Sequence, residues 1–186
     1  MDALTLLHER RSMGKLMAPV PEGEALEAIY QAALRAPDHK ELRPWHFIEF
    51  TGEGRERLGE IYAEAEFQAD PDASDTVLAS ARKKPLRAPM LIAVVARVQP
   101  DVPGVPRLEQ VLSAGCAGHA MLLAAYAQGF GAMWRTGKYA FDPVVHKGLG
   151  LGENDELIGF LYVGTPGGRL RPAPEHEIAK FVERWD

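Results

Sequence analysis

The sequence predicts an α+β fold formed by a single domain over residues 1–186. Several long segments repeat apolar residues with the period of a helix, and a few shorter apolar runs have the composition of strands. Strict alternation of helices and strands is weak, and no strand is followed by a G-x-G-x-x-G turn, so a dinucleotide-binding Rossmann domain is disfavoured. There is no internal repeat or linker-like stretch, and the length suffices for one sizeable core.

Helices are expected in six segments of the chain. They are residues 2–11, the stretch from Leu26 to Leu34, the stretch that starts at Arg55, residues 76–84, residues 107–128 and the stretch after Asp142. In the first helix we expect Asp2 as the N-cap and Ala3, Leu6 and Leu7 on the inward face. The second has the clearest amphipathic spacing and ends before Pro37, because proline disfavours helical geometry in the residue that precedes it.

Strands are expected in four segments. They are the run HFIEFTG from His46, residues 89–97, residues 130–135 and residues 156–165. The run PMLIAVVAR over 89–97 is continuously apolar and rich in β-branched residues, which predicts a strand buried on both faces. The last twenty or so residues are rich in proline, glycine and charge, and we expect them to form an extended arm that docks on another surface.

The charge balance and the cysteine count exclude several classes of protein. Twenty-six acidic residues against 21 basic ones give a net charge of −5, which argues against broad binding to the phosphate backbone of nucleic acids. Cys116 is the only cysteine, so no disulfide framework can form within the chain and a reducing cytoplasm fits. The first residues show no signal-peptide pattern.

The segment from Val111 to Trp134 is apolar enough to raise the question of a membrane span. It contains Ser113, His119 and Gln128, and much of it is alanine and glycine rather than leucine or phenylalanine. These features favour a helix buried within protein, covered in part by a second subunit, and hence a dimer with no membrane partner. A cysteine in such apolar surroundings is expected to be structural and unreactive.

Two short motifs could bind a ligand. Arg10, Arg11 and Ser12 combine forked donors with a hydroxyl, which suits a phosphate, although cations also favour the C-terminus of a helix. In AAYAQGFGAMWRTG (124–137) the glycines would admit a planar ligand, whereas the simpler interpretation is a helix cap and a core Trp134. His39 and His46 match no common metal-ligand spacing, so no metal site is predicted.

Six stretches together resemble the nitroreductase family of flavoproteins, in particular its small, minimal branch. They are MDALTLLHERRS, RAPDHKELRPWHF, GEGRER, SAGCAGHAM, AAYAQGFGAMWRTG and GFLYVGTP, which are spread over most of the chain. The resemblance implies an α+β sandwich with a central, mostly antiparallel sheet of four to five strands flanked by helices. It also implies an intertwined homodimer that holds FMN at the subunit interface.

The same resemblance assigns ligand contacts residue by residue. Arg10, Arg11 and Ser12 are expected to bind the phosphate and ribityl part of FMN, and Trp134, Arg135 and Thr136 to contact FMN from the end of a strand. Arg35 and His39 are expected to reach the FMN held mainly by the partner chain. The segment assigned to NADH or NADPH consists of Ala124, Ala125, Tyr126, Ala127, Gln128 and Gly129. No matching motif assigns Arg169 or Arg171.

The resemblance further implies an oxidoreductase with a ping-pong cycle. Hydride passes from NADH or NADPH to the flavin, which then reduces a small planar acceptor such as a nitroaromatic compound or a quinone. No side chain is required as a nucleophile. The alternative is an FMN-binding carrier or regulatory module with little turnover, which would use the same binding residues. Residues 66–80 and the last twenty or so residues match the family poorly. Residues 66–80 and 98–106 are expected to set acceptor specificity.

Overall fold

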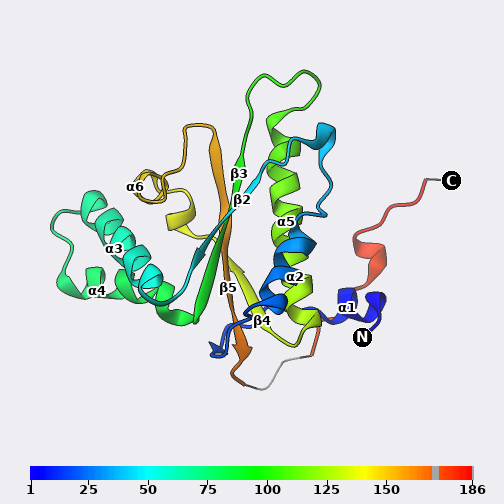
Figure 1. The fold of residues 1–186 in the computed structure, drawn as a ribbon, viewed down its shortest axis with the longest axis horizontal. Coiled ribbons are helices and arrows are strands. Elements are labelled where there is room, and N and C mark those ends of the chain that lie inside the picture. The colour runs from blue at the N-terminus through cyan, green and yellow to red at the C-terminus, as the bar shows by residue number, and fades with distance from the viewer. Residues whose placement is uncertain (169–171, 186) are drawn as a thin grey trace.

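The computed structural model describes residues 1–168 and 172–185 and forms one five-stranded sheet with helices on both faces (Figure 1). The strands are β1 (Leu16–Met17), β2 (Trp45–Phe50), β3 (Met90–Arg97), β4 (Gly131–Arg135) and β5 (Asp155–Pro166). One face is covered by α3 (Gly52–Ala69), α4 (Asp75–Lys83) and α6 (Pro143–Gly148), and the other by α2 (Glu24–Ala33) and α5 (Arg107–Ala127). The predicted α+β fold is therefore confirmed.

All strand pairs in the sheet are antiparallel. The long strand β5 lies in the middle, with β3 and then β2 on one side and both β4 and β1 on the other. β1 has only two residues, which is too short for a periodic signal, and the sequence did not predict it. Its pairing with the end of β5 brings the N-terminal segment to the same edge of the sheet as β4.

β3 is buried on both faces, as its continuous apolar sequence predicts. Leu91, Ala93 and Val95 belong to the core beneath α3, α4 and α6. Met90, Ile92 and Val94, which alternate with them, belong to the core beneath α2 and α5. Because successive side chains of a strand point to opposite faces, this one strand contributes to both cores.

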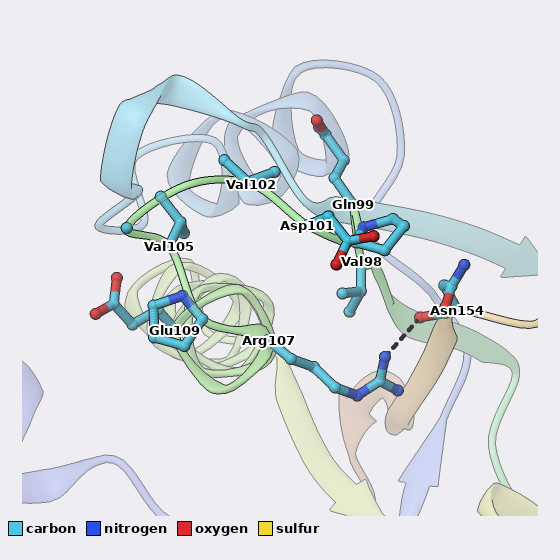
Figure 2. A pocket seen from close by; sticks show the side chains of 11 residues that line it. Val98, Gln99, Asp101, Val102, Val105, Arg107, Glu109 and Asn154 are labelled. Atoms are coloured by element: carbon cyan, nitrogen blue, oxygen red, sulfur yellow. Dashed lines mark hydrogen bonds between the residues drawn. The ribbon is translucent and has the colours of Figure 1, made fainter.

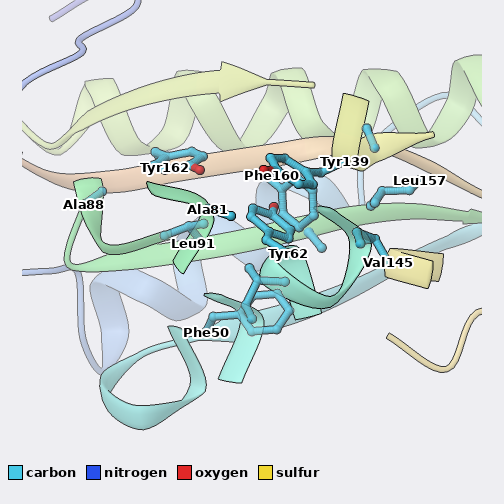
Figure 3. Packing of buried hydrophobic residues seen from close by; sticks show 14 of the residues in the cluster. Phe50, Tyr62, Ala81, Ala88, Leu91, Tyr139, Val145, Leu157, Phe160 and Tyr162 are labelled. Carbon is cyan, nitrogen blue, oxygen red and sulfur yellow. The ribbon is translucent and has the colours of Figure 1, made fainter. Parts of the chain in front are cut away.

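Aromatic rings dominate the core beneath α3, and Figure 3 shows them grouped beside the sheet. Tyr62 of α3 stacks on Tyr139 with ring centroids 3.9 Å apart and parallel planes. Phe160 of β5 meets Tyr62 edge-on, with centroids 5.8 Å apart. Phe160 pairs with Arg135 at the end of β4, and Tyr162 follows two residues later on the same face of β5, so this core reaches the end of β4.

The long helix α5 is buried on one face only. Ala114, Ala117, Met121 and Ala125 lie in the core, but Leu108 and Leu112 are 64% and 57% exposed on the opposite face. Cys116 lies on this exposed face of the single chain too, where a second subunit is expected to cover the helix. Within residues 1–168 and 172–185, no helix has both the length and the apolar character needed to cross a membrane.

The first helix, α1 (Ala3–Glu9), is shorter and more exposed than the sequence predicts. Asp2 is its N-cap, as expected, and accepts hydrogen bonds from the backbone N–H groups of Leu4 and Thr5 at 3.0 and 3.1 Å. However, none of its residues is buried and Leu7 is 53% exposed, so the predicted inward face was wrong. The helix lies outside α5 rather than against the sheet, near the C-terminal arm (Figure 1).

The C-terminal arm over residues 172–185 is exposed and contains one short 3-10 turn, Ile178–Lys180. Its apolar side chains include Phe181 and Trp185, which are 74% and 90% exposed. Arg169 and Arg171 lie outside the described residues.

Candidate functional site

The arginine–arginine–serine motif follows α1 and leads into a segment that runs beside β4. The backbone N–H of Met13 donates to the carbonyl of Ala132 at 3.0 Å. Arg11 donates through Nη2 to the hydroxyl of Tyr126 at 3.0 Å, and Ser12 is exposed. The motif therefore lies where α5 ends and β4 begins.

Gly131 makes this arrangement sterically possible. A Cβ at this position would lie 2.7 Å from Leu16 and 2.8 Å from the sulfur of Met13. The space left by the missing side chain is thus occupied by the chain's own N-terminal segment, which favours the structural one of the two interpretations left open by the sequence. Gly129 has φ +83° and follows the end of α5, which is the usual place for a glycine in the left-handed conformation.

A pocket of about 410 Å³ lies at the other end of β4. It is lined by four cationic side chains and by no carboxylate of the described residues; the cations are Lys84, Arg87, Arg135 and Lys138. Thr136 and Gly137 line it where β4 ends, and Tyr162 lies beneath Arg135, whose guanidinium carbon is 5.4 Å from the centre of the ring. The pocket is therefore suited to a ligand with an aromatic surface and negative charge.

Arg135 is the cation of this pocket with an unsatisfied hydrogen-bond donor. Its Nε atom is buried and has no hydrogen-bond partner among the described residues. Its Nη2 atom points toward Gly14, where it would lie 4.0 Å from a Cβ on that residue. Buried donors are nearly always satisfied in proteins, so the unpartnered Nε makes Arg135 a candidate contact for a ligand in this pocket.

Hydrogen bonds connect the aromatic wall of the pocket to charged groups. Tyr139 and Lys138 both donate to Glu66. Burial raises the pKa of Glu66, but these two hydrogen bonds and the charge of Lys138 outweigh it, and the net effect lowers that pKa. Burial, reinforced by the hydrogen bond to Glu66, raises the pKa of Tyr139 far above its ordinary value. The tyrosine therefore remains a neutral donor at physiological pH.

Trp134 points away from this pocket. Its indole ring lies against α5, where a Cβ on Gly118 would be 3.2 Å from the ring, and its Nε1 donates to the carbonyl of Ile158 at 3.3 Å. Arg135, the next residue, points to the opposite face of the sheet. Trp134 can therefore line the pocket only through its main chain, and its side chain belongs to the core as the simpler interpretation had it.

The segment expected to bind NADH or NADPH forms the last turn of α5. Ala124, Ala125 and Ala127 offer no polar side chain, and Gln128 donates to the carbonyls of Ala25 and Ala124, each at 3.1 Å. The hydroxyl of Tyr126 accepts from Arg11, as described above. These contacts give Tyr126 and Gln128 structural roles in the fold. They also place the segment beside the Arg10–Ser12 motif.

Arg35 and His39 lie far from the other expected site residues. His39 is bound through Nδ1 to Glu109, in the first turn of α5, at 2.7 Å. Arg11 contacts Tyr126 at the opposite end of the same 21-residue helix, which spans about 30 Å. Arg35 is exposed after α2. One chain therefore brings together Arg10–Ser12 and Arg135–Thr136 along β4 but leaves Arg35 and His39 apart.

Sequence reasoning missed the cations contributed from the other side of the pocket. Lys84 and Arg87 follow α4 in the basic run ARKKPLR, directly before β3. The clustering of basic residues at a helix–strand junction was a usable signal. His46, by contrast, has no link to His39: its Nε2 lies 3.1 Å from Nη2 of Arg97 on the neighbouring strand.

The fold and these residues define a member of the nitroreductase family. The model of that family matches residues 7–165, so the chain belongs to it and the resemblance read from the sequence is confirmed. The chain is 49% identical over 166 residues to the Escherichia coli K12 protein named "Putative NAD(P)H nitroreductase YdjA", covering 89% of each.

Solved structures agree with this assignment at the level of the fold. A nitroreductase-like family protein from Bacillus cereus matches with a TM-score of 0.82 at 23% identity, over 100% of this chain and 97% of that one. A Bacteroides fragilis nitroreductase, solved with bound FMN, matches with a TM-score of 0.73 at 22% identity, over the whole of both chains.

Proposed function

We propose that this protein is an FMN-dependent oxidoreductase that uses NADH or NADPH to reduce nitroaromatic compounds, quinones or similar planar acceptors. The observation that carries the proposal is the position of the Arg10–Ser12 motif and the cationic pocket at the two ends of β4. The strand has five residues and spans about 13 Å, a separation that suits a ligand with a phosphate at one end and a ring system at the other.

The residues present fit FMN in charge and in shape. Arg10 and Arg11 supply forked donors for a phosphate, as Arg does widely, and the exposed hydroxyl of Ser12 is available beside them. At the other end, the unpartnered Nε of Arg135 offers a donor, and Tyr162 offers an aromatic surface below it. The family relatives named for NAD(P)H, and the related structure with FMN, support the same assignment.

Each group has a defined task in this proposal. FMN, when bound, would supply the redox chemistry of a ping-pong cycle, with hydride from NADH or NADPH and two electrons for the acceptor. Arg10, Arg11 and Ser12 hold the phosphate. Lys84 and Arg135 place positive charge in the pocket, where it favours the anionic form of a reduced ring.

A homodimer completes the site in this proposal. Arg35 and His39 are exposed and distant from the pocket of their own chain, so they are available to the FMN of the partner subunit. Leu108 and Leu112 are exposed on α5, and this helix lies on the same side of the sheet as α1 and the C-terminal arm (Figure 1). Burying this face against a second copy would stabilise the dimer.

Flavin reduction tests the proposal directly. The purified protein, reconstituted with FMN under anaerobic conditions, is expected to lose its flavin absorbance on addition of NADH or NADPH and to regain it on addition of a quinone. Tight binding of FMN with no bleaching by either nucleotide would contradict the enzyme and favour the carrier. Failure to bind FMN would contradict both.

A further inference from the structure

His39 lies in a segment with an unusual backbone. Lys40, Glu41 and Arg43 all have positive φ, at 62°, 51° and 50°. Residues with a side chain rarely adopt this conformation, and a strained backbone persists only where its surroundings hold it. Asp38 provides one restraint, because its carboxylate accepts hydrogen bonds from the backbone N–H groups of Leu42 and Arg43 at 3.2 and 2.7 Å.

The loop over residues 98–106 provides a second restraint. Lys40 donates from Nζ to the carbonyl of Pro103, and Gln99 donates from Nε2 to the carbonyl of Leu42 at 3.1 Å. The loop is tied to α5 in turn, because the buried side chain of Gln110 exchanges two hydrogen bonds with the backbone of Gln99. The segment that carries His39 is therefore held from two sides.

The first turn of α5 adds a contact to His39 itself. Figure 2 shows Arg107 and Glu109 pointing to opposite sides of this turn. Arg107 donates to the carbonyl of Asn154 at 3.3 Å and to Glu156, which attaches the start of α5 to β5. Glu109 extends the other way, and its Oε2 lies 2.7 Å from Nδ1 of His39.

We propose that Glu109 is a positioning residue that accepts the Nδ1 proton of His39 and so directs Nε2 of the imidazole toward the FMN of the partner subunit. This inference rests on the proposed function, which places His39 at that cofactor. A neutral imidazole has one donor and one acceptor nitrogen, and a carboxylate at Nδ1 keeps the proton on that atom. Nε2, at the far side of the ring, is then available for a ligand.

The exposure of His39 and Glu109 indicates that their contact orients the imidazole ring rather than stabilises the fold. The side chains of His39 and Glu109 are 50% and 46% exposed, and ion pairs at such positions contribute little to folding. A contact of this kind can still restrict the orientation of one ring. The restrained backbone that follows His39 serves the same purpose.

The state of the His39 ring can be measured without any cofactor. In the ¹⁵N NMR spectrum of the apoprotein, the resonances of His39 are identified among the six histidines as those lost in His39→Asn. We expect a protonated Nδ1 in the wild type and in Glu109→Gln, whose amide oxygen still accepts the proton. We expect a shift toward protonated Nε2 in Glu109→Ala. An unchanged spectrum in Glu109→Ala would overturn the proposal.

FMN titrations, followed by quenching of flavin fluorescence, test whether this orientation serves the cofactor. We expect Glu109→Ala to raise the Kd for FMN by roughly fivefold, the scale of one half-exposed charged contact, with Glu109→Gln within about twofold of the wild type. In a His39→Ala background, Glu109→Ala should have no further effect. Glu60→Gln, which removes the exposed ion pair to Arg82, is the matched control and should bind FMN normally.

Two patterns of affinity loss would overturn the inference. They are an equal loss of affinity in Glu109→Gln and Glu109→Ala, and a full effect of Glu109→Ala in the absence of His39. If neither His39 nor Glu109 affects FMN binding while NADPH still bleaches the flavin, the inference fails and the proposed function stands. If the wild type binds no FMN, the proposed function itself fails, and the NMR result stands alone as a test of the His39–Glu109 pair.

Discussion

Lys84 donates from Nζ to the hydroxyl of Tyr139 at 3.1 Å and lies 4.6 Å from the centre of its ring. The two residues come from a helix–strand junction and a 3-10 turn that are 55 positions apart in the chain. Their contact forms one wall of the cationic pocket. It also makes Lys84, which the sequence shows only as part of a basic run, a candidate cofactor contact.

Replacing Lys84 tests whether the pocket holds the flavin ring. We expect Lys84→Met to weaken FMN binding about tenfold, because one charged donor is lost from a pocket that concentrates positive charge. The midpoint potential of bound FMN should also fall, since the anionic reduced form loses a stabilising cation. Lys83→Met, at the exposed neighbouring position, is the control; equal effects of the two variants would contradict the role of Lys84.

The Arg10–Ser12 motif is tested by comparing two flavins. We expect Arg10→Ala to raise the Kd for FMN by about tenfold or more while leaving the Kd for riboflavin nearly unchanged, because riboflavin has no phosphate. Fluorescence quenching measures both constants. Arg57→Ala, at an exposed position on α3, controls for the loss of one surface charge. Equal weakening of both flavins by Arg10→Ala would show that Arg10 does not bind the phosphate.

The lowered pKa of Glu66 predicts that the free energy of unfolding depends on pH. The net effect of its surroundings lowers its pKa in the folded state below the ordinary value of 4.5. Its contribution to stability is therefore present above that ordinary value and is lost as the pH falls through the lower, folded-state pKa. Melting temperatures of the wild type and Glu66→Gln should converge as the pH falls below about 4.5 and differ most near neutrality. A constant difference at all pH values would contradict this explanation.

A charged substitution on the exposed face of α5 tests whether this face forms the proposed dimer interface. In the proposed homodimer, where both subunits contribute to each site, we expect Leu112→Glu to produce monomers and to weaken FMN binding, because a buried carboxylate without a partner is strongly unfavourable. Sedimentation equilibrium measures the first effect and fluorescence quenching the second. Phe67→Glu, at an exposed apolar position on α3, is the matched control. A Leu112→Glu protein that remains dimeric would show that the interface lies elsewhere.

Gly59 tests the packing of α3 on α4. A Cβ there would lie 2.5 Å from the backbone carbonyl oxygen of Arg82, so we expect Gly59→Ala to reduce the free energy of unfolding by about 2 kcal/mol. Gly54 lies in the same helix, and a Cβ there would have its nearest neighbour, Phe50, at 4.0 Å. Gly54→Ala should therefore be neutral or slightly stabilising. Urea denaturation measures both, and equal effects would contradict the close approach.

Helices and strands with a strong apolar period could be predicted from the sequence. Features that depend on packing against neighbouring elements could not. α2 and β3 were predicted within a few residues, because their apolar patterns follow from facing a core on one side or on both. α1 was assigned an inward face that it lacks, since its helical pattern does not reveal that it lies outside α5. Cys116 is exposed in the single chain because α5 is apolar nearly all round, but the sheet covers only one of its faces.

The sequence by itself determined the fold class, the family and the candidate phosphate motif, because these depend on local spacing and on short stretches of residues. The tertiary structure alone decided that Arg135 and Lys84 share a pocket, that Trp134 points away from it, and that His39 rests on Glu109. These relationships depend on which distant segments the sheet and α5 bring together. No local pattern encodes them, because each arises from packing between elements far apart in the chain.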